Sequence, residues 1–192
     1  MKFKILSEQL LSKNWATLTK VTYEFENENE APGIVTREVY NRGNGATILL
    51  YNTEKGTVIL TRQFRIPTCF NGNPTGMMVE ACAGKLDDNE PEECIRRETQ
   101  EETGYTIGEV TKIMEVYMSP GSVTETIHFF IAPYSSAMKT GDGGGLDEEN
   151  EDIEVLELPF EKAYNMIKTG EIKDAKTIML LQYLALEKVL SF

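Results

Sequence analysis

Three glutamates on one short stretch carry the strongest chemical signal in this sequence. Glu98, Glu101 and Glu102 follow a double arginine, Arg96-Arg97. At about 100° per residue, positions i, i+3 and i+4 fall within roughly a 100° arc of one helix face. Like charges at this spacing weaken a helix by about 0.2–0.5 kcal/mol per pair. A hard divalent cation bound by oxygen ligands is the simplest way to offset that repulsion.

The helix face that carries these acids is expected to point into the protein. Traced backwards it passes through Ile95, Cys94 and Pro91, and traced forwards it reaches Tyr105. The alternative is a solvated acidic helix in which Arg97 and Glu101 pair at i,i+4. The inward position favours a metal site over that alternative. The outer face is expected to hold Glu92, Glu93, Arg96, Arg97, Gln100 and Thr103.

Residues 84–105, GKLDDNEPEECIRRETQEETGY, resemble the Nudix box, a loop–helix–loop signature with an R-E-x-x-E-E-x-G core. The first half departs from the usual pattern, since six residues rather than seven separate Glu90 from Arg97. The role of Glu90 is therefore left open. The core is matched by Arg97, Glu98, Glu101, Glu102 and Gly104.

The composition limits the class of protein. A chain of 192 residues suits one domain, with room for a small terminal addition. The net charge of −12 repels phosphate backbones, so we expect no nucleic-acid partner. Three cysteines without paired or metal-ligand spacing indicate reduced thiols. The polar N-terminal segment and the absence of a long apolar run favour a cytoplasmic protein without a membrane partner.

Mixed strands with one helix in the middle and two at the end predict an α/β sandwich. Strands are expected near 15–25 and 35–40, as an N-terminal hairpin, and near 46–51, 57–62, 76–83, 109–118, 125–131 and 153–158. Helices are expected near 91–103, 160–168 and 174–189. The resemblance implies a Nudix α/β/α sandwich with a mixed sheet, preceded by an antiparallel strand hairpin exchanged in a homodimer. The expected domains are a dimerisation region, 1–43, and a hydrolase domain, 44–192.

The resemblance also implies a metal site. Glu98, Glu102 and the carbonyl of Ala83 would bind Mg²⁺, with Mn²⁺ as an alternative cation. Glu101 is expected to act as a water-mediated ligand, as the partner of Arg97, or as both.

A long glycine-rich segment, 134–150, is too long for a simple connection and is expected to work as a lid. Its acidic end resembles the lid of the ADP-ribose and GDP-mannose pyrophosphatases. Glu151 is the first choice for a metal-linked acid, and Glu149 is the alternative base. A solvated acidic loop is the competing interpretation.

Substrate contacts follow from the same resemblance. Arg65 would grip a phosphate, or form a surface salt bridge. Trp15 would stack on a base, or anchor a core or interface. Lys176 would contact substrate, or be a solvated helix lysine. Ser122 replaces the second glycine of an S-P-G-G segment, which puts the loop shape in doubt. The full substrate-binding set is Trp15, Thr36, Arg37, Glu38, Arg65, Gly84, Lys85, Glu125, Asn150 and Lys176.

Segments along almost the whole chain, among them 37–52 and 151–160, look most like the bacterial GDP-mannose pyrophosphatase group. The implied reaction is hydrolysis of a nucleotide sugar, GDP-mannose to GMP and mannose 1-phosphate. ADP-ribose, giving AMP and ribose 5-phosphate, is the alternative. A non-catalytic Nudix-fold binding module would be expected to lack Glu98 and Glu102, and both are present. A calcium-binding structural protein would need EF-hand spacing, which the acidic segment 147–152 lacks.

Overall fold

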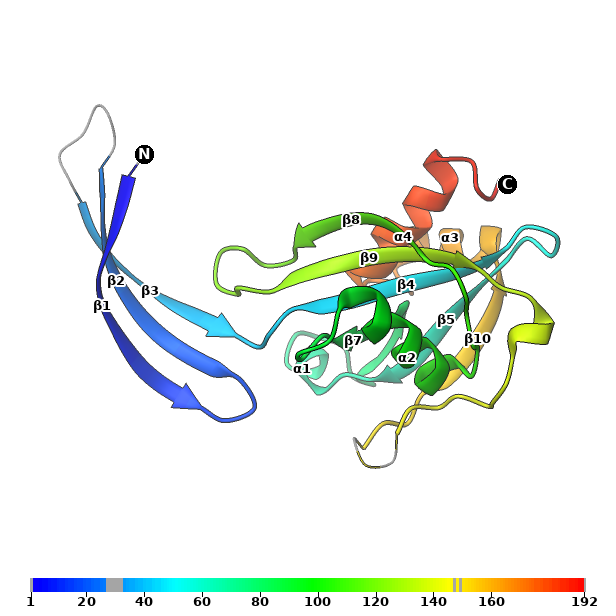
Figure 1. The fold of residues 1–192 in the computed structure, drawn as a ribbon, viewed down its shortest axis with the longest axis horizontal. Helices are drawn as coiled ribbons and strands as arrows, with labels where there is room; N and C mark the ends of the chain where they lie inside the picture. Colours follow the sequence, from blue (N-terminus) through cyan, green and yellow to red (C-terminus); the bar gives the residue numbers. More distant parts are fainter. Residues whose placement is uncertain (1, 27–32, 147, 149, 192) are drawn as a thin grey trace. The chain divides into compact units, whose positions relative to one another are not determined.

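The computed structural model describes residues 2–26, 33–146, 148 and 150–191 (Figure 1). The chain divides into two compact units. The first unit contains Met1–Asn44 and Val116–Ile127, and the second contains Gly45–Glu115 and His128–Phe192. Each unit is described by itself below.

The first unit is built on a three-stranded antiparallel sheet of β1 (Lys2–Lys13), β2 (Thr17–Glu26) and β3 (Gly33–Asn41). The predicted hairpin is therefore present as β2 and β3, and β1 is a further strand that was not predicted. Register shifts interrupt β1 between Ile5 and Ser7 and between Leu10 and Ser12. Each shift breaks the alternation of apolar and polar residues on which strand recognition depends.

The segment that follows β8 attaches to the end of β3 within this unit. Tyr40 N donates to Ser122 O over 2.8 Å, and Thr124 N donates to Tyr40 O over 3.0 Å. Ser122, which stands where the resembling segment has glycine, is not among the residues with positive φ. The serine side chain therefore causes no backbone strain in this turn.

A seven-stranded sheet forms the centre of the second unit. Its main path is β10-β5-β4-β9-β8, with β6 on β5 and β7 on β4. The predicted strand over 76–83 is in fact two strands that change partner at Ala81. The bounds are β4 (Gly45–Asn52), β5 (Thr57–Phe64), β6 (Met77–Glu80), β7 (Cys82–Lys85), β8 (Thr111–Tyr117), β9 (Thr126–Pro133) and β10 (Glu154–Pro159).

The sheet is mixed, as predicted. Strand β4 runs antiparallel to β5 and β7. Strands β4 and β9 run parallel, since Thr126 N bonds Asn44 Oδ1 near their starts and Tyr134 N bonds Tyr51 O near their ends.

Helices cover both faces of this sheet, with α2 (Pro91–Thr103) on one and α3 (Phe160–Thr169) and α4 (Ala175–Leu186) on the other (Figure 1). Alternate residues of β4, Ala46, Ile48 and Leu50, pack with Cys94 and Ile95 of α2. The intervening residues point to the opposite face. Two short helices, α1 (Ile66–Cys69) and η1 (Ser136–Met138), were not predicted. None of the helices in the described ranges has the length and apolar character needed to cross a bilayer.

Helix α2 begins and ends where its sequence signals predict. Pro91 occupies the first turn after the N-cap Glu90, and Gly104 ends the helix with φ 75°. Thr103 was predicted on the outer face, but it is buried and its hydroxyl donates to Thr99 O. That bond satisfies the hydroxyl inside the protein, so threonine is tolerated there.

Two leucines of α4 test how this helix packs on its face of the sheet. Leu181 is fully buried, whereas Leu186 is 79 % exposed. We expect Leu181→Ala to lower the free energy of unfolding by about 2–5 kcal/mol, because it leaves a cavity. The control Leu186→Ala should change it by no more than about 0.5 kcal/mol. Urea denaturation measures both, and equal losses would contradict this packing.

Candidate functional site

Two of the glutamates on α2 lie against strand β7. Glu102 is 2 % exposed, and the Glu98 side chain is 14 % exposed. A Cβ placed on Gly84 would overlap the carboxyl group of Glu98. A side chain at position 84 would therefore displace the Glu98 carboxyl group from its place against the strand.

Glu102 is a buried acid without full compensation. Its Oε2 atom has no hydrogen-bond partner in the described part of the chain. The pKa of Glu102 is raised to about 8, chiefly by burial and also by the charges of Glu98 and Glu151, although the Cys82 thiol and Arg65 act in the opposite direction. Burying a carboxylate in this way is costly unless a cation joins it.

Arg97 bridges the other two acids of the helix. Its guanidinium lies 2.5 Å from Glu98 Oε1 and 2.6 Å from Glu101 Oε2. The i,i+4 pair of Arg97 and Glu101 that was considered from sequence is therefore present. The pKa of Glu98 is still raised, because burial and the charges of Glu101 and Glu151 outweigh the effect of Arg97.

The glycine-rich segment binds the C-terminal end of α2 through its main chain. Gly144 N donates to Glu102 O over 2.9 Å, and Gly145 N donates to Glu101 O over 3.1 Å. These carbonyls belong to the last turn of α2, where the helix offers them no partner. The segment needs glycines because residues 143, 144 and 145 all have positive φ.

This attachment brings Glu151 beside the acids of α2. Glu151 Oε2 accepts a hydrogen bond from Leu146 N over 3.2 Å, and a Cβ on Gly145 would lie 2.5 Å from the Glu151 Cβ. The pKa values of both Glu98 and Glu102 respond to its charge. Asn150 turns the chain with φ 55°, which asparagine tolerates. Glu149, the alternative base, lies outside the described residues.

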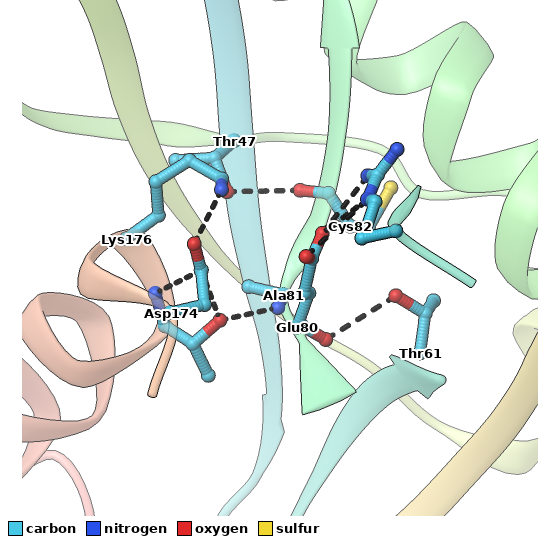
Figure 2. A network of polar contacts seen from close by, with 9 residues as sticks. Thr47, Thr61, Glu80, Ala81, Cys82, Asp174 and Lys176 are labelled. Atoms are coloured by element: carbon cyan, nitrogen blue, oxygen red, sulfur yellow. Dashed lines mark hydrogen bonds and ion pairs between the residues drawn. The ribbon is translucent and has the colours of Figure 1, made fainter. Parts of the chain in front are cut away.

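Two cation–acid pairs lie near the change from β6 to β7: Glu80 of one pair ends β6, and Asp174 and Lys176 of the other lie at the start of α4 (Figure 2). Arg65 binds Glu80, with Nη2 to Oε2 at 2.9 Å, and Lys176 Nζ lies 2.6 Å from Asp174 Oδ1. The Lys176 side chain is 18 % exposed, so its interpretation as a solvated lysine was wrong. Lys85 lies 3.6 Å from Asp87.

Sequence analysis missed both acids of these pairs. Glu80 stands among apolar strand residues next to the predicted box, and this position was the available signal. Asp174 precedes a predicted helix in a typical N-cap position. Neither position indicates by itself which cation the acid binds.

The remaining predicted substrate residues belong to the first unit. Trp15 is 66 % exposed, so it is not a core anchor of this chain. The Arg42 guanidinium lies 5.4 Å from the Trp15 ring centroid and its Nε atom 3.0 Å from Glu125 Oε1. Arg42 was also missed from sequence. Thr36, Arg37 and Glu38 lie on β3, where the Arg37 guanidinium donates to Thr36 O.

The residues of the second unit fit a divalent cation. Within the described ranges no three acidic, histidine or cysteine side chains converge on one point. A cation would therefore draw on the carboxylates of Glu98 and Glu102 together with a main-chain oxygen, for which Ala83 is the candidate. An all-oxygen donor set suits Mg²⁺, and the orphaned Glu102 Oε2 is the observation that favours it.

The charge on Glu102 makes stability depend on pH in metal-free protein. The folded protein keeps this proton up to about pH 8, whereas the unfolded chain releases it near pH 4.5. Stability should therefore fall as pH rises through this range. Glu102→Gln removes the charge, so the variant should gain stability relative to the unsubstituted protein between pH 5 and pH 9.

Thermal unfolding in a chelator at several pH values measures this difference. The control is Glu92→Gln on the same helix, where the side chain is 56 % exposed and pairs with Arg96. Its difference from the unsubstituted protein should not vary with pH. Identical pH profiles for the two variants would contradict the burial of an unpaired charge.

Two family models match successive parts of the chain. Residues 41–181 match the NUDIX domain family, and residues 2–40 match the N-terminal domain of GDP-mannose pyrophosphatase NudK. A relative from Escherichia coli (strain K12), named GDP-mannose pyrophosphatase, is 58 % identical over 180 residues, covering 94 % of this chain and 93 % of the relative. A relative of the same name from Escherichia coli O1:K1 / APEC is 55 % identical over 186 residues, covering 97 % and 96 %. The chain therefore belongs to the Nudix family.

Proposed function

We propose that this protein is a Mg²⁺-dependent hydrolase that cleaves the diphosphate bond of GDP-mannose to give GMP and mannose 1-phosphate. The observation that carries the proposal is the buried, unpaired carboxylate of Glu102, with Glu98 and Glu151 close enough to raise its pKa. The names of the similar proteins support the choice of substrate. ADP-ribose is the second candidate, because the resemblance covers the catalytic parts shared by both groups.

In this proposal the acids of α2 hold the cation, which when bound screens the diphosphate and acidifies a water molecule. Glu98 and Glu102 supply carboxylate oxygens. Glu151 takes a proton from the attacking water molecule while the oxygen of that water forms a bond to one phosphorus atom. The P–O bond to the other phosphate breaks, and that phosphate leaves with the electron pair. Glu101 stays paired with Arg97 and keeps the guanidinium in place.

Each unit by itself offers candidates for substrate contact. In the second unit, Arg65 and Lys176 would contact phosphate oxygens, and Gly84 and Lys85 would line the approach to them. In the first unit, Trp15 offers an exposed ring for stacking on the base. Thr36, Arg37, Glu38 and Glu125 are the further candidates there, and Asn150 is the candidate in the acidic loop.

The proposal is tested by substituting the metal ligands. Glu98→Gln and Glu102→Gln should each lower Mg²⁺-dependent turnover at least about a hundredfold, because a metal ligand loses its charge. The control Glu92→Gln, on the exposed face of the same helix, should keep full turnover. Products are identified by chromatography with GDP-mannose, ADP-ribose and other nucleotide sugars as substrates.

Near-normal turnover by either purified, folded variant would refute the assignment of the metal ligands. Hydrolysis of ADP-ribose alone would replace the proposed substrate by its alternative. Cleavage of none of the nucleotide sugars by the unsubstituted protein would reject the proposed reaction.

We further propose a cytoplasmic homodimer in which the residues before 44 form the dimerisation region. The exposed apolar residues of β1 support this, because an edge strand with apolar side chains in water is a site for association. These residues are Phe3, Ile5, Leu6, Leu10 and Leu11.

Leu10→Lys should therefore shift the protein towards the monomer, since it puts a charge into the proposed interface. Gln9→Lys is the matched control, because neighbouring residues of a strand point to opposite faces. Light scattering reports the mass against 21.6 kDa for one chain. A monomeric unsubstituted protein would contradict the dimer.

A further inference from the structure

We propose that Glu80 and Asp174 are positioning residues, which hold the cations Arg65 and Lys176 in place for the diphosphate of the substrate. This inference rests on the proposed function, because it concerns the same site. Neither acid touches the substrate in this proposal. Each acts through the cation that it binds.

Glu80 fixes the plane of the Arg65 guanidinium. Arg65 Nε lies 3.2 Å and Nη2 2.9 Å from Glu80 Oε2, so the carboxylate binds the side edge of the guanidinium. Glu80 is 5 % exposed, whereas the Arg65 side chain is 39 % exposed. A guanidinium carries five N–H groups, and this arrangement uses two of them. The other three remain for an anion.

Arg65 keeps its positive charge in this setting. Burial lowers the pKa of Arg65, but the hydrogen bond and charge of Glu80 and the charges of other acids raise it by more, so the net shift is upward. The guanidinium therefore stays charged, as a phosphate contact requires.

Asp174 serves two partners with its two oxygens. Oδ2 accepts from Thr177 N over 2.9 Å and from the Thr177 hydroxyl over 2.7 Å, which caps α4. Oδ1 binds Lys176 Nζ over 2.6 Å. The Thr177 hydroxyl oxygen in turn accepts from Ala81 N over 2.7 Å, at the change from β6 to β7 (Figure 2). Lys176 is thereby fixed relative to the strand that continues to Gly84.

Stability alone is a weak reason for these acids. Buried ion pairs often contribute little to folding, since desolvation cancels much of the attraction. The cap of α4 needs an acceptor at position 174 but no charge, because asparagine caps as well as aspartate. The charges of Glu80 and Asp174 are therefore explained by what they do to Arg65 and Lys176.

Glu80→Gln tests the first pair. The amide group of glutamine presents N–H groups to the guanidinium, so Arg65 should lose its fixed orientation while the volume stays the same. We expect kcat/KM for the nucleotide sugar to fall roughly ten- to a hundredfold. The same substitution in an Arg65→Lys background should have less than about a threefold effect, because the residue that it positions is already lost.

Asp174→Asn tests the second pair, because asparagine keeps the cap and removes the charge. We expect an unchanged Tm and a kcat/KM that is lower by roughly tenfold. In a Lys176→Met background the further effect should be less than about threefold. Asp174→Ala, which also removes the cap, should lower Tm as well.

The inference would be overturned if either acid substitution lowered kcat/KM by the same factor in the unsubstituted protein and in the variant that lacks its cation. Unchanged kcat/KM in Glu80→Gln and Asp174→Asn would overturn it as well. Calorimetry with inorganic pyrophosphate and Mg²⁺ gives a second readout that needs no hydrolysis. Weaker pyrophosphate binding by both variants would support positioning even if the protein cleaved no nucleotide sugar. Unchanged pyrophosphate affinity in both variants would overturn positioning while leaving the proposed reaction intact.

Discussion

The burial of the Glu102 carboxyl group is the constraint on which the rest of the site depends. Its position follows from the packing of α2 on the sheet, since Cys94 and Ile95 of α2 pack with β4. The close approach at Gly84 brings strand and helix together around it. Core packing thus holds in place an arrangement that electrostatics alone would disfavour.

The proposed metal ligands and phosphate contacts belong to one unit of the chain, and the candidate base contacts belong to the other. Every proposed metal ligand in the described ranges lies in the second unit, together with the cations Arg65 and Lys176. The first unit carries Trp15, Arg42 and Glu125, which combine an exposed aromatic ring with a cation and an acid. Such a set suits a nucleoside better than a phosphate. The two family matches, to residues 2–40 and 41–181, divide the chain in a similar way.

The sequence predicted those helices and strands that are determined by residues close together in the chain. Pro91 and Gly104 set the ends of α2, and the strands predicted near 46–51 and 125–131 are present as β4 and β9. Strand β1 was missed because its register shifts break the pattern. The roles of Glu80 and Asp174 could not be predicted, since their partners are set by side-chain packing in three dimensions. The binding of the glycine segment to α2 could not be predicted either, because main-chain hydrogen bonds do not depend on the type of side chain.

The glycine segment that joins Glu151 to α2 has a consequence for turnover. Glycine loses more conformational entropy on ordering than any other residue. Ordering three consecutive glycines therefore leaves only a small free energy in favour of the attached state of this segment. Local opening should therefore require far less energy than melting α2 or the sheet. Under the proposed function, this local opening would let Glu151 withdraw and return in each turnover while the core that holds Glu98 and Glu102 stays folded.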